Sequence, residues 1–343
     1  MVTTISDPRK VSEDQFLDSA SPEEQLKFLL NYAVLAPSIH NSQPWRFKVT
    51  GSEVAVYADR ARASPVVDPD DREMVISCGA ALFNLRVALR GFGFVPTVYR
   101  FPVLNDPDLL ATVEMGPRRK PAEDWSRLFH AIKRRHTNRS PFEQRPLPTR
   151  DLRLLYEAAA TEGARLDAFT DLDARSSLAS LIATGDEVQS SSKGFRREVA
   201  SWLHPSRSGS LDGIPGYANG LRDWLANAGP YVARTFDWGS GKAAHDMQLA
   251  EGSPALLVIS MDGDGISDWL KAGQALERVL LTATDLGLTA SFLNQPVEVG
   301  DLRPRVAELF DGVEIPQIIL RIGYGAPVRS TPRRPVREVM KRY

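Results

Sequence analysis

Several features that mark whole classes of protein are missing from this sequence. It has a single cysteine, Cys78, which excludes an internal disulfide and is typical of a reducing compartment. Because Cys78 lies in the apolar stretch MVISCGAAL, we expect a buried structural thiol and not a nucleophile. The polar N-terminus does not resemble a signal peptide, and no apolar run reaches the roughly 20 residues of a membrane span. These absences predict a cytoplasmic protein.

An excess of one charge and a metal-ligand pattern are also missing. Lys and Arg total 42 and Asp and Glu total 43, so the formal net charge is −1. Such a balance gives no general attraction to nucleic acid or to an anionic membrane. The five histidines do not have the spacing of metal ligands, so no metal site is predicted. We therefore expect a small-molecule partner, with no nucleic acid, membrane or metal.

What the sequence does contain is a regular order of helix and strand patterns. Ser21, Pro22 and Glu24 predict a helix start with a capping box, and Pro37 ends that helix. Two strand patterns follow, RFKV and EVAVYAD, and then a long apolar helix that residues 68–71 can cap. Two short strands close this first section.

The same order returns in the second part of the chain. A helix pattern, DLRLLYEAAA, leads to the strands RLDAFT and PALLVIS, the long helix KAGQALERVLLTATDLGL, and two further strands. We therefore predict an α+β fold in which residues 1–343 form one compact unit of two repeats, 20–118 and 119–343. Residues 187–248 have no counterpart in the first repeat and are interpreted as an insertion.

Four polar motifs stand out from this pattern. They are APSIHNSQPW (36–45), RRHTNR (134–139), LGLTASFLNQP (286–296) and PRRP (332–335). Together they resemble the FMN-dependent nitroreductase superfamily, and more narrowly its fused-repeat, Acg-type branch, over roughly residues 20–340. The resemblance implies a nitroreductase-like α+β fold with a central, mostly antiparallel sheet flanked by helices. It also implies an internal duplication that mimics the homodimer of the family.

By this resemblance, the four motifs would bind FMN non-covalently. The implied cofactor-binding residues are Pro37, Ser38, Ile39, His40, Asn41, Arg135, His136, Thr137, Arg139, Phe292, Leu293, Asn294, Gln295, Arg333 and Arg334. Arginine suits a phosphate because its planar fork donates two parallel hydrogen bonds. Arg135 would reach the phosphate or ribityl chain together with Arg333 and Arg334, and Arg139 would approach the N1/O2 edge of the flavin. Thr137 stands where the family usually has a serine.

The loop of the first repeat would supply the opposite wall. Pro37 and Ser38 would line the ribityl and phosphate side, and Asn41 would act as a polar anchor. Gln43 and Trp45 are interpreted as structural, with Gln43 bonding to the loop backbone and Trp45 wedged under it. At the end of ASFLNQ, the backbone N–H of Asn294 would bond to flavin N5. The usual acidic residue and glycine of the family are replaced there by Asn294 and Gln295.

No catalytic side chain is predicted, because hydride transfer to a flavin needs no protein nucleophile. His40 and His136 are expected to make local hydrogen bonds. The resemblance implies NAD(P)H as the reductant and a nitroaromatic or a quinone as the acceptor. A flavin-sequestering protein with little turnover is the alternative, and a structural protein that has lost FMN is a third.

Each motif also has an interpretation without a cofactor. The run 133–135 could be a solvated helix end, residues 36–47 a purely structural turn, and PRRPVREV a flexible basic tail. The insertion could be a lid over the flavin or a second packing layer, since Trp202, Trp224 and Trp238 demand burial.

The repeats lack complementary parts of a flavin site. The first repeat has the PSIHN loop but no paired arginines before its helix, and the second has the arginines but AAATEGARLDAF in place of the loop. We therefore expect one FMN per chain. A functional monomer is expected because both halves of the site are in one chain, and further dimerisation stays open.

Overall fold

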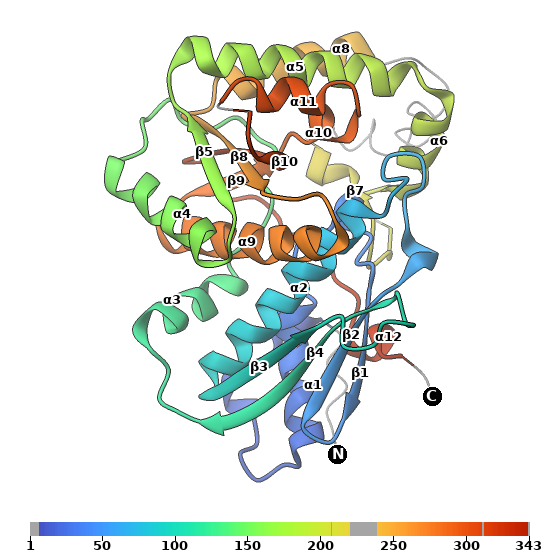
Figure 1. The fold of residues 1–343 in the computed structure, drawn as a ribbon, viewed down its shortest axis with the longest axis vertical. Helices are drawn as coiled ribbons and strands as arrows, with labels where there is room; N and C mark the ends of the chain where they lie inside the picture. The colour runs from blue at the N-terminus through green and yellow to red at the C-terminus, as the bar shows by residue number, and fades with distance from the viewer. Residues whose placement is uncertain (1–6, 207, 220–238, 311, 342–343) are drawn as a thin grey trace.

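Two antiparallel four-stranded sheets, one from each half of the chain, form the frame of the protein (Figure 1). The computed structural model describes residues 7–206, 208–219, 239–310 and 312–341. In the first sheet the order is β1 (Trp45–Thr50), β2 (Glu53–Ala58), β4 (Leu109–Arg118), β3 (Phe94–Arg100). In the second it is β5 (Arg165–Phe169), β8 (Ala255–Met261), β10 (Ile315–Gly323), β9 (Thr289–Phe292). The predicted antiparallel pairing is therefore divided between two sheets.

The helices complete the correspondence between the halves. In the first half, α1 (Pro22–Ala33) precedes β1, and α2 (Arg72–Gly91) separates β2 from β3. In the second half, α4 (Thr149–Thr161) precedes β5, and α9 (Ile266–Asp285) separates β8 from β9. The helix α3 (Glu123–Ile132) connects the halves. Both halves thus have one topology, as the repeated sequence pattern predicts.

The first helix begins as its sequence predicts. The Ser21 side chain accepts the N–H of Glu24, the Glu24 carboxylate accepts the N–H of Ser21, and Pro22 occupies the first turn. At the start of α2 the cap is Asp68, whose carboxylate accepts the N–H groups of Glu73 and Met74 at 3.0 and 2.9 Å. Both helices therefore start where their side chains satisfy free backbone donors.

The two long helices α2 and α9 cross between the sheets, and glycine makes the crossing close (Figure 1). A Cβ on Gly79 would overlap the carbonyl oxygen of Leu270, and a Cβ on Gly273 would overlap that of Ile76. Each glycine thus meets the carbonyl three residues before the other glycine. This reciprocal contact is what a two-fold relation between the halves requires.

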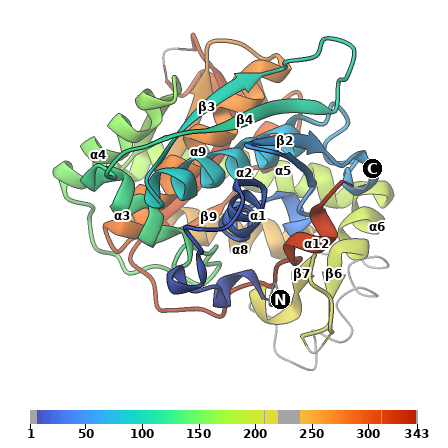
Figure 2. The ribbon, with the colours of Figure 1, turned by 90° about the horizontal axis from the view of Figure 1, so that it is seen from below.

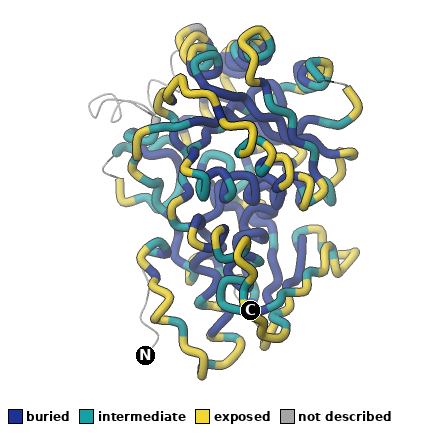
Figure 3. Tube along the Cα trace, turned by 90° about the vertical axis from the view of Figure 1, so that its left-hand side faces the viewer, coloured by how far each residue is buried: buried dark blue, intermediate teal, exposed yellow. Residues whose placement is uncertain are grey.

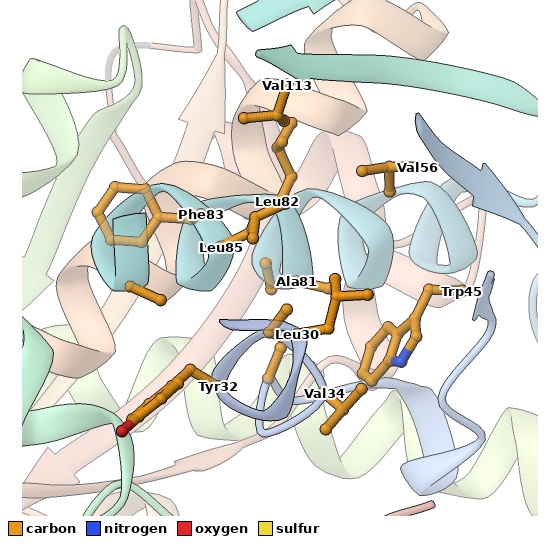
Figure 4. Close-up of a cluster of buried hydrophobic side chains, with 14 of the residues drawn as sticks. Leu30, Tyr32, Val34, Trp45, Val56, Ala81, Leu82, Phe83, Leu85 and Val113 are labelled. Atoms are coloured by element: carbon orange, nitrogen blue, oxygen red, sulfur yellow. The ribbon is translucent and has the colours of Figure 1, made fainter. Parts of the chain in front are cut away.

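The hydrophobic core of the first half surrounds α2. Figure 4 shows Val56 and Val113 of the sheet on one side of this helix and Leu30 of α1 on the other. Among the described helices, α2 is the one long and apolar enough to cross a membrane, yet 83% of that stretch is buried inside the protein. Cys78 on α2 is fully buried, as predicted, and burial raises the pKa of its thiol.

Buried backbone continues from one half into the other (Figure 3). Leu270 and Leu281 of α9 pack in the core around α2, whereas Ile76 of α2 packs in the core of the second half. The halves therefore share their interior and do not meet only at a surface.

The insertion of the second half lies between β5 and β8. Its described elements are α5 (Leu172–Ser191), α6 (Lys193–Trp202), β6 (Leu203–His204), β7 (Ile214–Pro215) and α8 (Gly239–Glu251). The predicted helix in GFRREVASW is confirmed by α6, and Trp202 is partly buried. The predicted helix GLRDWLANAGP, with Trp224 and Trp238, lies outside the described residues.

The C-terminal segment returns to the first half (Figure 2). After α10 (Gln295–Glu298), α11 (Arg303–Ala307) and β10, the helix α12 (Val336–Val339) packs against α1 and β1. The Lys341 N–H donates to the Phe47 carbonyl of β1 at 2.8 Å. The 3₁₀ helices are η1 (Pro8–Lys10), η2 (Glu13–Gln15), η3 (Ile39–Asn41), η4 (Arg60–Arg62) and η5 (Gly216–Asn219).

Candidate functional site

A cavity of about 580 Å³ lies where the two halves and the insertion meet. Its walls come from the loop after α1, the first turns of α2, the end of β9, and the insertion helices α6 and α8. The predicted cofactor residues on these walls are Pro37, Ser38, Ile39, His40, Arg139, Phe292, Leu293, Asn294 and Gln295. The structure therefore brings together, at one cavity, three motifs that are far apart in the sequence.

The loop of the PSIHN motif is held in an unusual backbone conformation. His40, Asn41 and Gln43 have φ values of 49°, 56° and 53°, a region that residues other than glycine rarely adopt. Gln43 is fully buried and acts as predicted, because its side chain donates to the Leu211 and Asn41 carbonyls at 2.8 and 3.3 Å. Backbone strain of this kind persists only where surrounding contacts fix it.

Trp45 has the structural role that its sequence predicts. Its side chain is fully buried, and Figure 4 shows it beside Val34, at the end of α1. The Trp45 ring therefore fills the space between the loop and the core of the first half.

Asn41 lies outside the cavity walls and joins three segments of chain. Its side-chain amide donates to the Gly213 carbonyl at 2.9 Å and to the Pro332 carbonyl at 3.3 Å. Its side-chain oxygen accepts a bond from Arg333 Nη1 at 2.8 Å. The polar anchor predicted for the cofactor thus connects the loop, the insertion and the C-terminal segment.

Arg135 and Arg333 lie directly behind the loop. Arg135 Nη2 donates to the Leu35 carbonyl at 3.1 Å, and Arg333 Nη2 donates to the Ala36 carbonyl at 3.1 Å. Both arginines are buried, with 3% and 5% exposure. They hold the end of α1 next to Pro37 in the cavity wall. Cations are favourable there because the C-terminal end of a helix is the negative end of its dipole.

A third arginine, the partly buried Arg9, completes this cluster, and the sequence motifs do not include it. Arg9 Nη1 donates to the Lys133 carbonyl at 3.1 Å, while its Nε and Nη2 have no acceptor among the described residues. Burial and the neighbouring Arg135 lower the pKa of Arg9 to about 10. Glu277 is the carboxylate nearest to Arg135, at 3.5 Å from Nε, and burial raises the pKa of Glu277 to about 7. The cluster of Arg9, Arg135, Arg333 and Glu277 therefore has more positive than negative charge.

Two arginines face the cavity itself. Arg139 makes no hydrogen bond to any described residue, and burial lowers its pKa. Arg321 is fully buried on β10, where Nη2 donates to the Asn138 and Ser140 carbonyls at 3.0 Å. Its Nε and Nη1 have no hydrogen-bond acceptor among the described residues, and its guanidinium carbon lies 4.0 Å from the centre of the Phe142 ring. Sequence reasoning missed Arg321, although an arginine inside the apolar strand PQIILRIGYG is itself a signal, since a buried charge needs a partner.

Asn294 is placed as a donor at the end of β9. Its side-chain amide donates to Glu73 Oε1 at 3.0 Å, and its side-chain oxygen accepts the Ile319 N–H at 2.9 Å. Its backbone N–H bonds to no acceptor among the described residues. This N–H is therefore available to a ligand.

A second polar group belongs to the insertion. Lys242 of α8 forms ion pairs with Asp186 of α5 and, at 2.6 Å, with Asp246. Gln295 donates to Asp246 at 2.9 Å and to Asp186 at 3.1 Å. Burial raises the pKa of Asp186 to about 6. This group fastens the insertion to α10 over the cavity.

The remaining predicted residues lie at or behind the walls. Burial lowers the pKa of His40 to about 4, so its ring is neutral at pH 7. His136 makes the local bond predicted for it, from Nδ1 to the Arg134 carbonyl at 2.7 Å. Thr137 lies beside Ala290 of β9, and Arg334 Nη2 donates to the Glu338 carbonyl at 2.8 Å. Arg135, His136, Thr137, Arg333 and Arg334 are not on the cavity walls.

The burial of arginine side chains corrects two of the interpretations in which a motif has no role in cofactor binding. The C-terminal PRRP segment is not a flexible tail, because Arg333 and Arg334 are only 5% and 9% exposed and hold the PSIHN loop. The run after α3 is a solvated helix end only in part, since Arg134 is exposed but Arg135 is buried.

Known proteins resemble this chain over nearly its full length. No protein-family model matches it. It is 33% identical to "Putative NAD(P)H nitroreductase Rv3131" of Mycobacterium tuberculosis, over 93% of this chain and 91% of that protein. It is 30% identical to "Putative NAD(P)H nitroreductase acg" of the same organism, over 94% and 97%. Among solved structures, the FMN-dependent nitroreductase NfnB of Mycobacterium smegmatis, in complex with NADPH, covers 63% of this chain and 97% of its own, with 18% identity and a TM-score of 0.42.

The alignments to Rv3131 and Acg each cover more than nine tenths of this chain and therefore extend over both halves. With such coverage, the resemblance cannot come from one shared motif alone. The chain belongs to the family of the NAD(P)H nitroreductase-like proteins Rv3131 and Acg.

Proposed function

We propose that the protein binds FMN non-covalently in the cavity and acts as an NAD(P)H-dependent reductase of quinones or nitroaromatics. The observation that carries this proposal is the set of unsatisfied donors around the cavity. Arg139 and the Asn294 N–H have no acceptor among the described residues, and Arg321 leaves Nε and Nη1 without one, although burying unpaired donors costs free energy. A ligand with acceptor atoms along a flat ring would satisfy them.

The residues present fit the parts of FMN. Phe292, Leu293 and Ile39 offer apolar contact to a ring, and the Asn294 N–H would bond to flavin N5. Arg139 and Arg321 would stabilise the negative charge that a reduced flavin carries. The cluster of Arg9, Arg135 and Arg333 lies behind the loop at Pro37, outside the cavity walls, and its surplus positive charge would attract the phosphate to that side of the cavity.

When bound, FMN would supply the redox chemistry by accepting a hydride and passing it on. The protein residues would bind and orient it and exclude water from the cavity. The relatives are named NAD(P)H nitroreductases, which favours NAD(P)H as the source of the hydride.

The colour of the purified protein tests the proposal directly. A yellow protein that NADPH bleaches, and that a quinone or nitroaromatic restores, is the expected result. A colourless protein that does not take up added FMN would overturn it. We propose a functional monomer because the cavity is built within one chain, and sedimentation of the FMN-loaded protein checks this.

A flavin-sequestering function is the second candidate, and the insertion is the observation that favours it. Phe195 and Val199 of α6 and Lys242 of α8 line the cavity, and the ion pairs of Lys242 fasten this cover. A fastened cover would slow the entry of NADPH. Stopped-flow reduction decides between the candidates, since fast bleaching that is unchanged by Lys242→Ala would argue against a closed lid.

A further inference from the structure

The side-chain amide of Asn294, after the end of β9, is held at both of its polar atoms. The last backbone bond between this segment and β10 runs from the Leu293 N–H to the Ile319 carbonyl, at 2.9 Å. The Asn294 side-chain oxygen then accepts the Ile319 N–H at 2.9 Å, and the side-chain nitrogen donates to Glu73 Oε1 at 3.0 Å. Because an amide has a separate donor and acceptor, these two bonds fix its orientation.

The acceptor of this amide comes from the other half of the chain. Glu73 lies in the first turn of α2, and both Glu73 and Asn294 line the cavity. The Asp68 carboxylate accepts the Glu73 N–H at 3.0 Å, and the Glu73 carboxylate pairs with Arg72 at 3.2 Å. The Glu73 side chain is only 7% exposed. Glu73 therefore offers Asn294 an acceptor whose own position is fixed.

Arg72 holds the chain close to Asn294 on two further elements. Its Nη1 donates to the Gln317 carbonyl of β10 at 2.6 Å, and its Nη2 donates to the Val297 carbonyl of α10 at 3.2 Å. Gln317 lies two residues before Ile319, and Val297 lies three residues after Asn294. Arg72 is a buried charged donor, and such donors make the stronger hydrogen bonds. The start of α2 thus fixes both segments that carry the partners of the Asn294 amide.

The backbone of Asn294 is fixed on its carbonyl side as well. Its carbonyl accepts the Val297 and Glu298 N–H groups at 2.8 and 3.0 Å. Its own N–H bonds to no acceptor among the residues that the structure describes. This donor is therefore pre-organised, since the bonds around it are already made before a ligand arrives.

We propose that Arg72 and Glu73 of the first half are positioning residues for the Asn294 N–H, the donor to flavin N5. This inference rests on the proposed function. A donor that must meet one reacting atom is sensitive to placement, since an error of about 1 Å can cost on the order of 100-fold in rate. The first half thus fixes the direction of a donor that the second half supplies, and neither half makes this part of the site alone.

Nitrogen-15 spectroscopy of bound FMN reads this placement without any turnover. In Glu73→Ala the Asn294 amide loses its acceptor, so the N5 resonance of ¹⁵N-labelled FMN should move toward its position in an aprotic solvent. Asn294→Asp should move it in the same direction, because the new carboxylate can accept the Ile319 N–H but cannot donate to Glu73. Glu73→Gln keeps an acceptor oxygen and should leave the resonance where it is.

The rate of FMN reduction by NADPH provides a second measurement. It should fall by about 10- to 100-fold in Glu73→Ala and in Asn294→Asp. The double variant should be no slower than either one, because both substitutions break the same bond. Glu162→Ala is the matched control, since Glu162 is an ion-paired glutamate with 8% exposure that does not line the cavity. It should move neither the resonance nor the rate.

Hydrogen exchange tests the arrangement in the flavin-free protein. The Ile319 amide should exchange about tenfold faster in Glu73→Ala than in the wild type, since the Asn294 side chain that accepts its bond is then held at one end only. Unchanged exchange, or an N5 resonance that stays in place in both Glu73→Ala and Asn294→Asp, would overturn the assignment. A protein that takes up no FMN would overturn the proposed function and the link to N5, whereas the exchange rate would still decide whether Glu73 holds Asn294.

Discussion

The two ends of the α2–α9 crossing are built from corresponding elements but carry different charges. Glu277 lies four residues after Gly273, and Phe83 lies four residues after Gly79. The glycines make reciprocal contacts, so Glu277 and Phe83 occupy corresponding positions in the two halves. The end around Glu277 is called the first end here, and the end around Phe83 the second end.

At the first end, buried positive charge is in surplus. Arg9, Arg135 and Arg333 lie near Glu277, whose pKa burial raises to about 7, and Arg9 also lies near Asp7. At the second end, the loop after α4 supplies Glu162, which accepts bonds from Arg86 Nη1 at 2.6 Å and from Arg278 Nε at 2.9 Å.

Aromatic rings complete the second end. Arg86 and Arg278 each lie 5.2 Å from the centre of the Phe83 ring, and Arg278 lies 4.9 Å from that of Trp125. Cations so placed are satisfied by a carboxylate and by ring faces. The difference teaches that two halves of one topology can keep a surplus of positive charge at one end of the crossing and neutralise it at the other.

The largest expected effect concerns the number of FMN molecules that each chain binds. A fully loaded chain should release one equivalent of FMN, because only the first end has unpaired donors beside the PSIHN loop. Measuring flavin absorbance after denaturation, against protein concentration, gives this number. Two equivalents would show that the second end also binds FMN. Glu162→Ala should leave the number at one, since it restores no loop there.

The reciprocal glycine contact predicts a large loss of stability. Gly273→Ala should lower the free energy of unfolding by about 3 kcal/mol, because the new methyl group overlaps the Ile76 carbonyl and the helices must separate. Urea unfolding measures this. Gly241→Ala on α8 is the control, since a Cβ there meets nothing within 4 Å, and its effect should stay within about 0.5 kcal/mol.

At pH 8, replacing Glu277 by glutamine should raise the free energy of unfolding, whereas replacing Glu162 by glutamine should lower it. Burial raises the pKa of Glu277 from its ordinary value of 4.5 to about 7, so its contribution to stability is full below about pH 4.5 and is lost as pH rises through 7. The glutamine of Glu277→Gln cannot ionise. Between about pH 4.5 and pH 8 the free energy of unfolding of this variant should therefore rise, relative to the wild type, by up to about 3 kcal/mol.

Glu162→Gln should instead destabilise the protein at pH 8, by about 2 kcal/mol, because Arg86 and Arg278 lose their counter-charge. Thermal unfolding of both variants from pH 4 to pH 9, in the absence of FMN, checks the pair of predictions. Equal responses of the two variants would contradict the difference between the ends.

The last prediction concerns cofactor affinity. Arg135→Ala should weaken FMN binding by about 1.5–3 kcal/mol, because a desolvated charge-assisted bond to phosphate is lost. Titration of flavin fluorescence measures the change. Arg134→Ala removes an exposed neighbour and should leave the affinity unchanged. An unchanged affinity in Arg135→Ala would remove Arg135 from the phosphate site and leave it only the role of holding α1.

Local patterns in the sequence were enough to predict many elements of the fold. The capping box of Ser21 and Glu24, the structural roles of Gln43 and Trp45, and the repeated order of helices and strands all depend on neighbours in the chain. Short-range hydrogen bonds and hydrophobic periodicity decide such features, so they can be read from sequence. The four polar motifs are each continuous in the sequence, and their resemblance to the nitroreductase superfamily predicted that they form one site.

What only the tertiary structure decided is how distant charges meet. Arg9 lies near Arg135, Arg321 faces the cavity, and Glu73 of one half and Glu298 of the other line that same cavity. No spacing in the sequence marks such groups, because the close crossing of α2 and α9 and the return of the C-terminal segment bring them together. Burial then fixes their charge states, since the cost of removing a charge from water depends on the groups that surround it.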